Sequence, residues 1–198
     1  NATVIGDVEL ARDATVLPEA AIRADYGERI VIGEGSDVQE GCSLHVDAGF
    51  PLTVGRNVII GHNATVHGCT VEDGVLIVSG RGEMSDYNEE TAAPWADYAQ
   101  EIQSVVVEKD ISSIGDNAFC GDYPYLTSLV LPDTLQRIGE NAFAGCAALE
   151  SVVLPQTLVE IGNNAFLGCE SLNMALFAGT PEEYARLSIG EGNDALLR

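Results

Sequence analysis

Apolar or small side chains recur every six residues through the N-terminal half of the chain. The positions are Ile5, Ala11, Leu17, Ile32, Val38, Leu44, Val54, Ile60 and Val66. A hexapeptide period is the signature of a parallel β-helix, in which three short strands make one triangular coil of about 18 residues. Arg23 takes the position after Leu17, and insertions of about three residues (25–30) and about four residues (47–51) interrupt the period, as corner loops can. We therefore predict a β-helix.

All three histidines of the chain, His45, His62 and His67, fall in its central coils. Leu44 and Val66 are one coil plus one insertion apart, so the count places His45 and His67 on one face, stacked and pointing outward. Arg23 belongs to the same face one coil earlier. His62 follows Ile60 by two residues and lies on the adjacent face, across a corner.

Three imidazoles are a full set of protein ligands for a catalytic zinc ion whose fourth position holds water. One chain offers two ligands on one face and a third that points elsewhere, so a complete site needs a neighbouring chain. This geometry predicts a cyclic homotrimer with metal sites at its interfaces. The alternative is three polar side chains on a solvated face of the β-helix.

Several motifs of residues 2–78 resemble the γ-class carbonic anhydrases in both order and spacing. They are residues 2–8 (ATVIGDV), 22–25 (IRAD), 37–40 (DVQE), 44–47 (LHVD), 60–62 (IGH) and 66–69 (VHGC). The resemblance implies a left-handed β-helix and a zinc, iron or cobalt ion held by the three histidines across a trimer interface.

Residue roles follow from the same resemblance. Gln39 would hold the metal-bound hydroxide that attacks carbon dioxide, and Arg23 and Asp25 would join a polar network that bridges subunits. Tyr26 and Ala48 stand where active members of the family carry acidic proton-shuttling residues.

A second repeat follows the first. The string Ile-Gly-x-Asn-Ala-Phe occurs at residues 114–119, 138–143 and 161–166, and a strand-like run ending in proline precedes the later copies. A period of 20 to 29 residues with one strand per repeat is typical of a leucine-rich-repeat solenoid. The Asn-Ala-Phe-x-Gly-Cys element (141–146 and 164–169) resembles the BspA-type leucine-rich repeats of bacterial surface proteins. That resemblance covers about residues 74–198, and residues 179–184 resemble the closing helix of such arrays.

We therefore predict a mainly β chain of two domains. Residues 1–78 form the β-helix, and residues 79–198 form a short leucine-rich-repeat solenoid with a small C-terminal helix. The seam falls within residues 74–78, where natural recombination and an engineered fusion would look alike. Because Asn1 is not an initiator methionine, we expect a processed or excised piece of a longer protein.

Charge and hydropathy narrow the function classes. The net charge of −22 divides into −8 for residues 1–79 and −14 for residues 80–198, which argues against a nucleic-acid surface. No apolar run approaches the length of a membrane span. The five cysteines do not suggest a disulfide framework, and we expect Cys42, Cys146 and Cys169 to be small core residues.

Three functions stay open. The first is a carbonic anhydrase-like enzyme acting on carbon dioxide or bicarbonate. The second is a leucine-rich-repeat module that binds a protein or a glycan, with the β-helix as a non-catalytic cap. The third is a fused scaffold without activity. The N-terminal resemblance points to a cytoplasmic protein and the C-terminal one to a cell-surface or secreted protein.

Overall fold

The computed structural model describes residues 1–88 and 90–197, which form two compact units. The first unit is Asn1–Gly80, and the second begins at Arg81. Apart from one isolated antiparallel bridge between Asp47 and Phe50, the strand pairings of the described residues are parallel. The predicted fold class is confirmed: the chain is mainly β, with parallel strands wound into a solenoid and one small α-helix.

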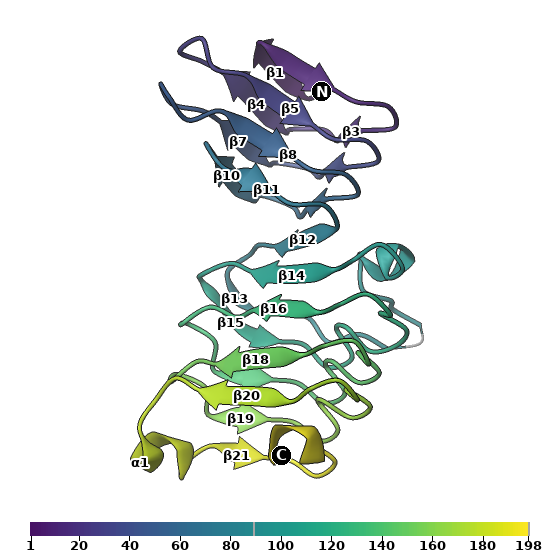
Figure 1. Ribbon diagram of the computed structural model, residues 1–198, viewed down its shortest axis with the longest axis vertical. Helices are drawn as coiled ribbons and strands as arrows, with labels where there is room; N and C mark the ends of the chain where they lie inside the picture. Colours follow the sequence, from purple (N-terminus) through teal and green to yellow (C-terminus); the bar gives the residue numbers. More distant parts are fainter. Residues whose placement is uncertain (89, 198) are drawn as a thin grey trace. The chain divides into compact units, whose positions relative to one another are not determined.

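Three parallel ladders build the first unit (Figure 1). The first contains β1 (Thr3–Gly6), β4 (Ala21–Ala24), β7 (Ser43–His45) and β10 (Thr65–His67). The second contains β2 (Val8–Leu10), β5 (Ile30–Ile32), β8 (Leu52–Val54) and β11 (Thr70–Val71). The third contains β3 (Thr15–Val16), β6 (Asp37–Val38), β9 (Ile59–Ile60) and β12 (Val75–Val78). Each coil therefore contributes one strand to each ladder, as a triangular β-helix requires.

Stacked apolar side chains fill the interior of this unit. Ile22 pairs with Leu44, which pairs with Val66, and all three side chains are buried. The apolar side chains of the other two ladders stack in the same way. Because strand residues alternate between the two faces, the neighbours of these buried residues point outward.

The register predicted before residue 25 is wrong by one residue. Val4 pairs with Ile22, whereas Ile5 pairs with Arg23, so the inward positions of the first coils are Val4, Leu10, Val16 and Ile22. The coil that contains the first insertion is consequently 22 residues long, like the next one, and both insertions have the same length. A one-residue slip exchanges the two faces of a strand, so Arg23 points outward.

Two rows of stacked parallel strands build the second unit, and each row forms one edge of the array. One edge contains β13 (Gly82–Glu83), β15 (Ile111–Ile114), β17 (Arg137–Ile138), β19 (Glu160–Ile161) and β21 (Ser188–Ile189). The other contains β14 (Ser104–Val107), β16 (Ser128–Val130), β18 (Ser151–Leu154) and β20 (Met174–Phe177) (Figure 1). The strand register continues through Ile114, Ile138, Ile161 and Ile189. The strand that contains Ile189 therefore belongs to the array, although the sequence repeat did not reveal it.

An aromatic column forms the core of the second unit. Phe119, Phe143 and Phe166 are fully buried, and their stacked rings lie 5.1 and 5.4 Å apart between centroids. Trp95 extends the column because its ring stacks on Phe119 at 5.1 Å and its Nε1–H donates to the Ala118 carbonyl. Trp95 therefore caps the core, whereas Tyr125 is exposed.

The asparagine of each Asn-Ala-Phe string has a backbone reason. Asn117, Asn141 and Asn164 have φ values of 57°, 53° and 56°. Among residues with a side chain, asparagine adopts this left-handed conformation most readily. The repeat therefore conserves a turn geometry together with a core ring.

Short helices complete the second unit. The 3₁₀ turns η1 and η2 span Ala96–Tyr98 and Asp194–Leu197, and α1 spans Pro181–Tyr184. Thr180 and Glu183 form a capping box at the N-terminus of α1, which lies where the closing helix was expected. Within the described part of the chain, no helix has the length and hydropathy needed to cross a membrane.

Candidate metal site

Arg23, His45 and His67 occupy matching positions on three successive coils. Arg23 on β4 pairs with His45 on β7, which pairs with His67 on β10. The imidazole rings of His45 and His67 lie 4.4 Å apart between centroids, with a tilt of 38° between their planes. His45 and His67 are stacked at matching outward positions, as predicted, whereas Arg23 joins their row only after the one-residue correction of its register.

Carboxylates hold the two ends of this row. The Arg23 guanidinium donates to Asp25 Oδ2 from Nε at 3.1 Å and from Nη2 at 2.6 Å. At the other end, Nε2 of His67 lies 3.1 Å from Oδ2 of Asp47. Asp25 was expected beside Arg23, whereas no sequence pattern had linked Asp47 to His67.

The corner loop after His45 packs against the coil that carries His67. Asp47 and Phe50 close this loop through their isolated bridge, and Phe50 lies over Gly68. A Cβ atom at Gly68 would stand 2.8 Å from the Phe50 Cβ, and the Gly68 φ of +45° already favours glycine. Gly68 therefore lets the loop, and with it Asp47, lie close to His67.

His62 lies at a different corner. It occupies the turn between β9 and β10, and so precedes β10, whereas His67 is the last residue of that strand. One coil earlier, Gln39 and Glu40 form the equivalent corner. The backbone N–H of Gln39 donates to the Ile60 carbonyl, and the backbone N–H of Asn63 donates to the Glu40 carbonyl. Backbone stacking thus brings Glu40 beside His62, where the Glu40 Oε2 lies 2.9 Å from Nδ1.

Gln39 is oriented by its neighbour on the same face. Its Nε2 donates to Asp37 Oδ2 at 3.3 Å, and the hydroxyl of Thr15 donates to the other oxygen of this largely buried carboxylate. Because its amide nitrogen is engaged, Gln39 presents its carbonyl oxygen as a hydrogen-bond acceptor.

The six predicted residues therefore fall into two groups. Arg23, Asp25, His45 and His67 lie along the first ladder, and Gln39 and His62 lie at the corner between β9 and β10 or its equivalent one coil earlier. Among the described residues of one chain, no three side chains of the His, Cys, Asp and Glu types come close enough to hold a metal ion.

The available donors nevertheless fit a zinc-type ion in their chemistry. The half-buried imidazole of His45 and the exposed imidazole of His67 lie side by side. The third, His62, has a carboxylate at one nitrogen, which is the usual arrangement of metal-ligating histidines. Zinc binds imidazole nitrogen at about 2.0–2.1 Å, so one ion could bridge rings as close as His45 and His67. The third ligand would have to come from a second copy of the chain.

Part of the chain is similar in sequence to known proteins. A probable carbonic anhydrase of Methanocaldococcus jannaschii is 41% identical over 76 residues, close to the length of the first unit. The first unit resembles the γ-class carbonic anhydrases. Protein YrdA of Escherichia coli K12 is 39% identical over 87 residues, and the mitochondrial gamma carbonic anhydrase 2 of Arabidopsis thaliana is 34% identical over 86 residues.

These three similarities are partial in both directions. They cover 38%, 40% and 40% of this chain and 47%, 47% and 31% of the three relatives, in the order given. The chain therefore spans less than half the length of each of these relatives.

The second unit is similar to a different family. The family model described as BspA type leucine rich repeat region (6 copies) matches residues 97–185. The chain thus joins a segment similar to γ-class carbonic anhydrases to a BspA-type leucine-rich repeat segment, as the sequence resemblances indicated.

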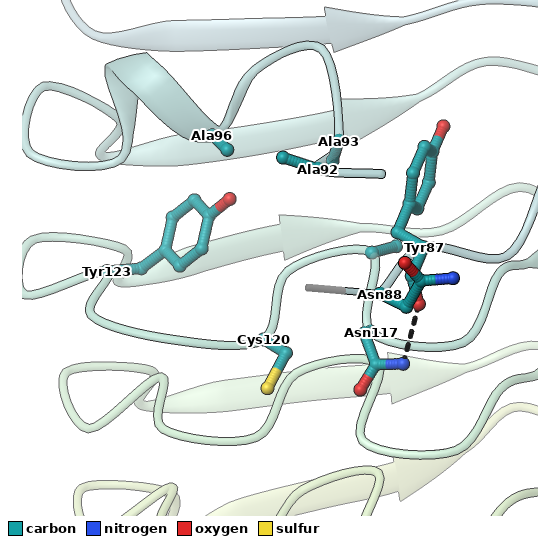
Figure 2. Close-up of a pocket in the computed structure, with 9 residues that line it drawn as sticks. Tyr87, Asn88, Ala92, Ala93, Ala96, Asn117, Cys120 and Tyr123 are labelled. Atoms are coloured by element: carbon teal, nitrogen blue, oxygen red, sulfur yellow. Dashed lines mark hydrogen bonds between the residues drawn. The ribbon is translucent and has the colours of Figure 1, made fainter. Parts of the chain in front are cut away.

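The second unit offers two further surface features. Val130, Val153 and Leu176 are about half exposed on β16, β18 and β20, and Val153 pairs with Leu176. Separately, a cavity of about 400 Å³ lies beside η1. Figure 2 shows Tyr123 and Cys120 on one side of it, Tyr87, Asn88 and Asn117 on the other, and small alanine side chains near η1. Asn117 Nδ2 donates to the Tyr87 carbonyl, and the labelled lining carries no charged side chain.

Proposed function

We propose that the first unit assembles into a homotrimer, binds one zinc, iron or cobalt ion at each interface and hydrates carbon dioxide. His45 and His67 of one chain and His62 of the next are the ligands. The in-register pair of His45 and His67, together with the position of His62 before β10, carries the proposal. The similarity to γ-class carbonic anhydrases supports it.

The bound ion would supply the chemistry common to such sites, a water whose pKa falls to about 7 and which yields hydroxide for attack on carbon dioxide. The chain's own residues would hold the ion and orient the reacting groups around it. The side-chain carbonyl oxygen of Gln39, oriented by the hydrogen bond from its Nε2 to Asp37, would accept a hydrogen bond from an O–H group at the ion. Arg23, fixed by Asp25, places a positive charge on the row of His45 and His67. This charge would stabilise a bicarbonate product bound there.

Subunit mixing tests the shared site. His45→Ala and His62→Ala variants carrying different purification tags are each purified, then unfolded, mixed and refolded. Each variant alone should bind no zinc at the site. A mixed trimer should regain about one site in three, because only one of its interfaces combines an intact His45 with an intact His62.

Zinc content of the mixed trimers, isolated through both tags, and carbon dioxide hydration by the same fraction are the readouts. Retention of zinc by either variant alone contradicts the ligand set. Failure of the mixture to regain zinc, when wild-type chains treated identically do regain it, contradicts the shared interface.

A second candidate function belongs to the second unit. The exposed row of Val130, Val153 and Leu176 is an apolar stripe on a strand surface, the place where repeat arrays bind partners. On this reading the first unit is a cap. Surface plasmon resonance with a panel of glycans and purified surface proteins tests it, with Val153→Asp as the stripe variant. Binding that is lost in Val153→Asp but kept in His45→Ala supports the module, and binding unaffected by Val153→Asp contradicts it.

A further inference from the structure

One oxygen of Glu40 stands out among the carboxylates of the first unit. The Glu40 side chain is 46% exposed as a whole, yet its Oε2 atom is enclosed and accepts no hydrogen bond from the described residues. An enclosed carboxylate oxygen without a donor is costly, by about 1–3 kcal/mol or more for a charged group. A donor for this atom is therefore the first thing to seek.

Nδ1 of His62 lies 2.9 Å from Oε2 of Glu40. The backbone fixes the two residues side by side, because the corners that carry them are joined by the hydrogen bonds from Gln39 to Ile60 and from Asn63 to Glu40. At this distance only the orientation of the imidazole decides whether Nδ1–H points at the oxygen. The half-exposed ring has room to adopt that orientation.

A neutral imidazole carries its proton on one nitrogen and a lone pair on the other. If Nδ1–H is engaged by Glu40, the lone pair is on Nε2. A ligating histidine whose other nitrogen donates to a carboxylate is fixed in tautomer and ring orientation and becomes a stronger base.

We propose that Glu40 is a positioning residue for His62, which holds the Nδ1–H tautomer and keeps the Nε2 lone pair available to a cation bound by a second copy of the chain. The cation part rests on the proposed function. The contact between Glu40 and His62 and the tautomer it selects belong to the single chain and need no metal.

His67 provides an internal contrast. Its carboxylate partner, Asp47, stands at Nε2 rather than at Nδ1. The same reasoning therefore assigns the Nε2–H tautomer to His67 in the metal-free chain. Two histidines of one protein should thus show opposite tautomers, which one spectrum can reveal.

Long-range ¹H–¹⁵N correlation spectra of the metal-free, ¹⁵N-labelled full chain measure this directly. At about pH 8, above the ordinary histidine pKa of about 6.5, the ring nitrogen shifts report which nitrogen is protonated. In the wild type we expect Nδ1–H for His62 and Nε2–H for His67. In Glu40→Ala, His62 should move toward Nε2–H, the form that an unconstrained imidazole favours, while His67 stays unchanged.

Matched variants separate a specific contact from a general loss of structure. Glu72→Ala removes an exposed acid of the same unit whose side chain forms no ion pair or hydrogen bond with the residues that the structure describes, and it should leave both tautomers unchanged. Glu40→Gln keeps the shape and an acceptor oxygen, so it should retain part of the Nδ1–H form. A His62 that is Nε2–H in the wild type, or whose tautomer does not respond to Glu40→Ala, overturns the proposal.

Zinc titration against a chromophoric chelator provides the second readout. Loss of such an outer partner costs metal affinity about 10- to 100-fold, so Glu40→Ala should bind zinc that much more weakly than the wild type and Glu72→Ala should not. The two readouts also separate the two proposals. A tautomer change without zinc binding by the wild type leaves the role of Glu40 intact and contradicts the proposed function. If the wild type binds zinc but the His62 tautomer is unchanged in Glu40→Ala, the proposed function is supported and the role of Glu40 is contradicted.

Discussion

The imidazoles of His45 and His67 lie 4.4 Å apart because the two residues are register partners on β7 and β10. Their separation is set by the repeat of the β-helix, since the two residues belong to different coils. The parallel ladder fixes two outward donors side by side, as a shared cation requires, and the same ladder places Arg23 next to His45. The geometry of the site is thus a property of the repeat.

Removal of His67 should abolish metal binding without unfolding the protein. The His67 side chain is 42% exposed and packs in no apolar core, so His67→Ala should change the free energy of unfolding by no more than about 0.5 kcal/mol. Zinc titration and urea unfolding of the same preparation check both parts. A large loss of stability would show that His67 serves the fold.

The aromatic column of the second unit should carry much of its stability. Phe143 is fully buried between Phe119 and Phe166, so Phe143→Ala should cost about 3–5 kcal/mol. Leu167→Ala, at a position that is 52% exposed, is the control and should cost far less. Fluorescence of Trp95, the single tryptophan of the chain, follows urea unfolding at the end of this column. Equal costs for the two variants would contradict the packing.

Thiol reactivity should divide the cysteines into two classes. Burial raises the pKa of Cys42 and of Cys169 to about 11 and raises the pKa of Cys146 as well, so these three buried thiols carry little thiolate. Cys69 and Cys120 are exposed. A chromogenic disulfide reagent at about pH 8 should modify these two in the folded chain and the other three only after denaturation. Rapid modification of a third thiol would contradict the burial.

The ion pair of Asp73 with Arg56 should make the stability of the first unit depend on pH. Asp73 accepts the amide proton of Arg56 at 2.8 Å and pairs with its guanidinium, and these hydrogen bonds lower the pKa of Asp73. A lowered pKa stabilises the fold above the unfolded-state value of about 3.9, and the contribution is lost as pH falls through the folded-state pKa below it. Asp73→Asn should therefore be less stable than the wild type at neutral pH.

The stability difference between Asp73→Asn and the wild type should shrink as the pH falls through that acidic window. Urea midpoints of the two proteins across this range measure it. A difference that persists unchanged at the acid end would mean that the hydrogen-bond geometry, and not the carboxylate charge, provides the effect.

Sequence patterns predicted the β-helix and its register from Ile32 onward, and failed earlier for a definable reason. Val4 and Ile5, Leu10 and Ala11, and Val16 and Leu17 are adjacent apolar or small pairs, so periodicity alone does not say which member faces inward. After residue 30, Val38, Leu44, Val54 and Val66 have only polar or glycine neighbours, and these positions fix the register even though Ile32 and Ile60 follow apolar residues. A charged residue at Arg23 was the available signal that the earlier register had slipped.

Asp25 was expected beside Arg23, but the contacts of Glu40 and Asp47 with histidines were not predicted, although the spacing of Glu40 contained a clue. Glu40 precedes His62 by the same 22 residues that separate His45 from His67. A coil-by-coil alignment would have put Glu40 beneath His62. The contact of Asp47 with His67 depends on how its corner loop packs over Gly68, which no periodic pattern encodes.

Size-exclusion chromatography with light scattering, combined with metal analysis of the same peak, tests the central claim most directly. We expect a trimer of the full chain that carries about one metal ion per chain and loses that metal in His62→Ala. A metal-free monomer, after purification with zinc, iron and cobalt each supplied in turn, would contradict it.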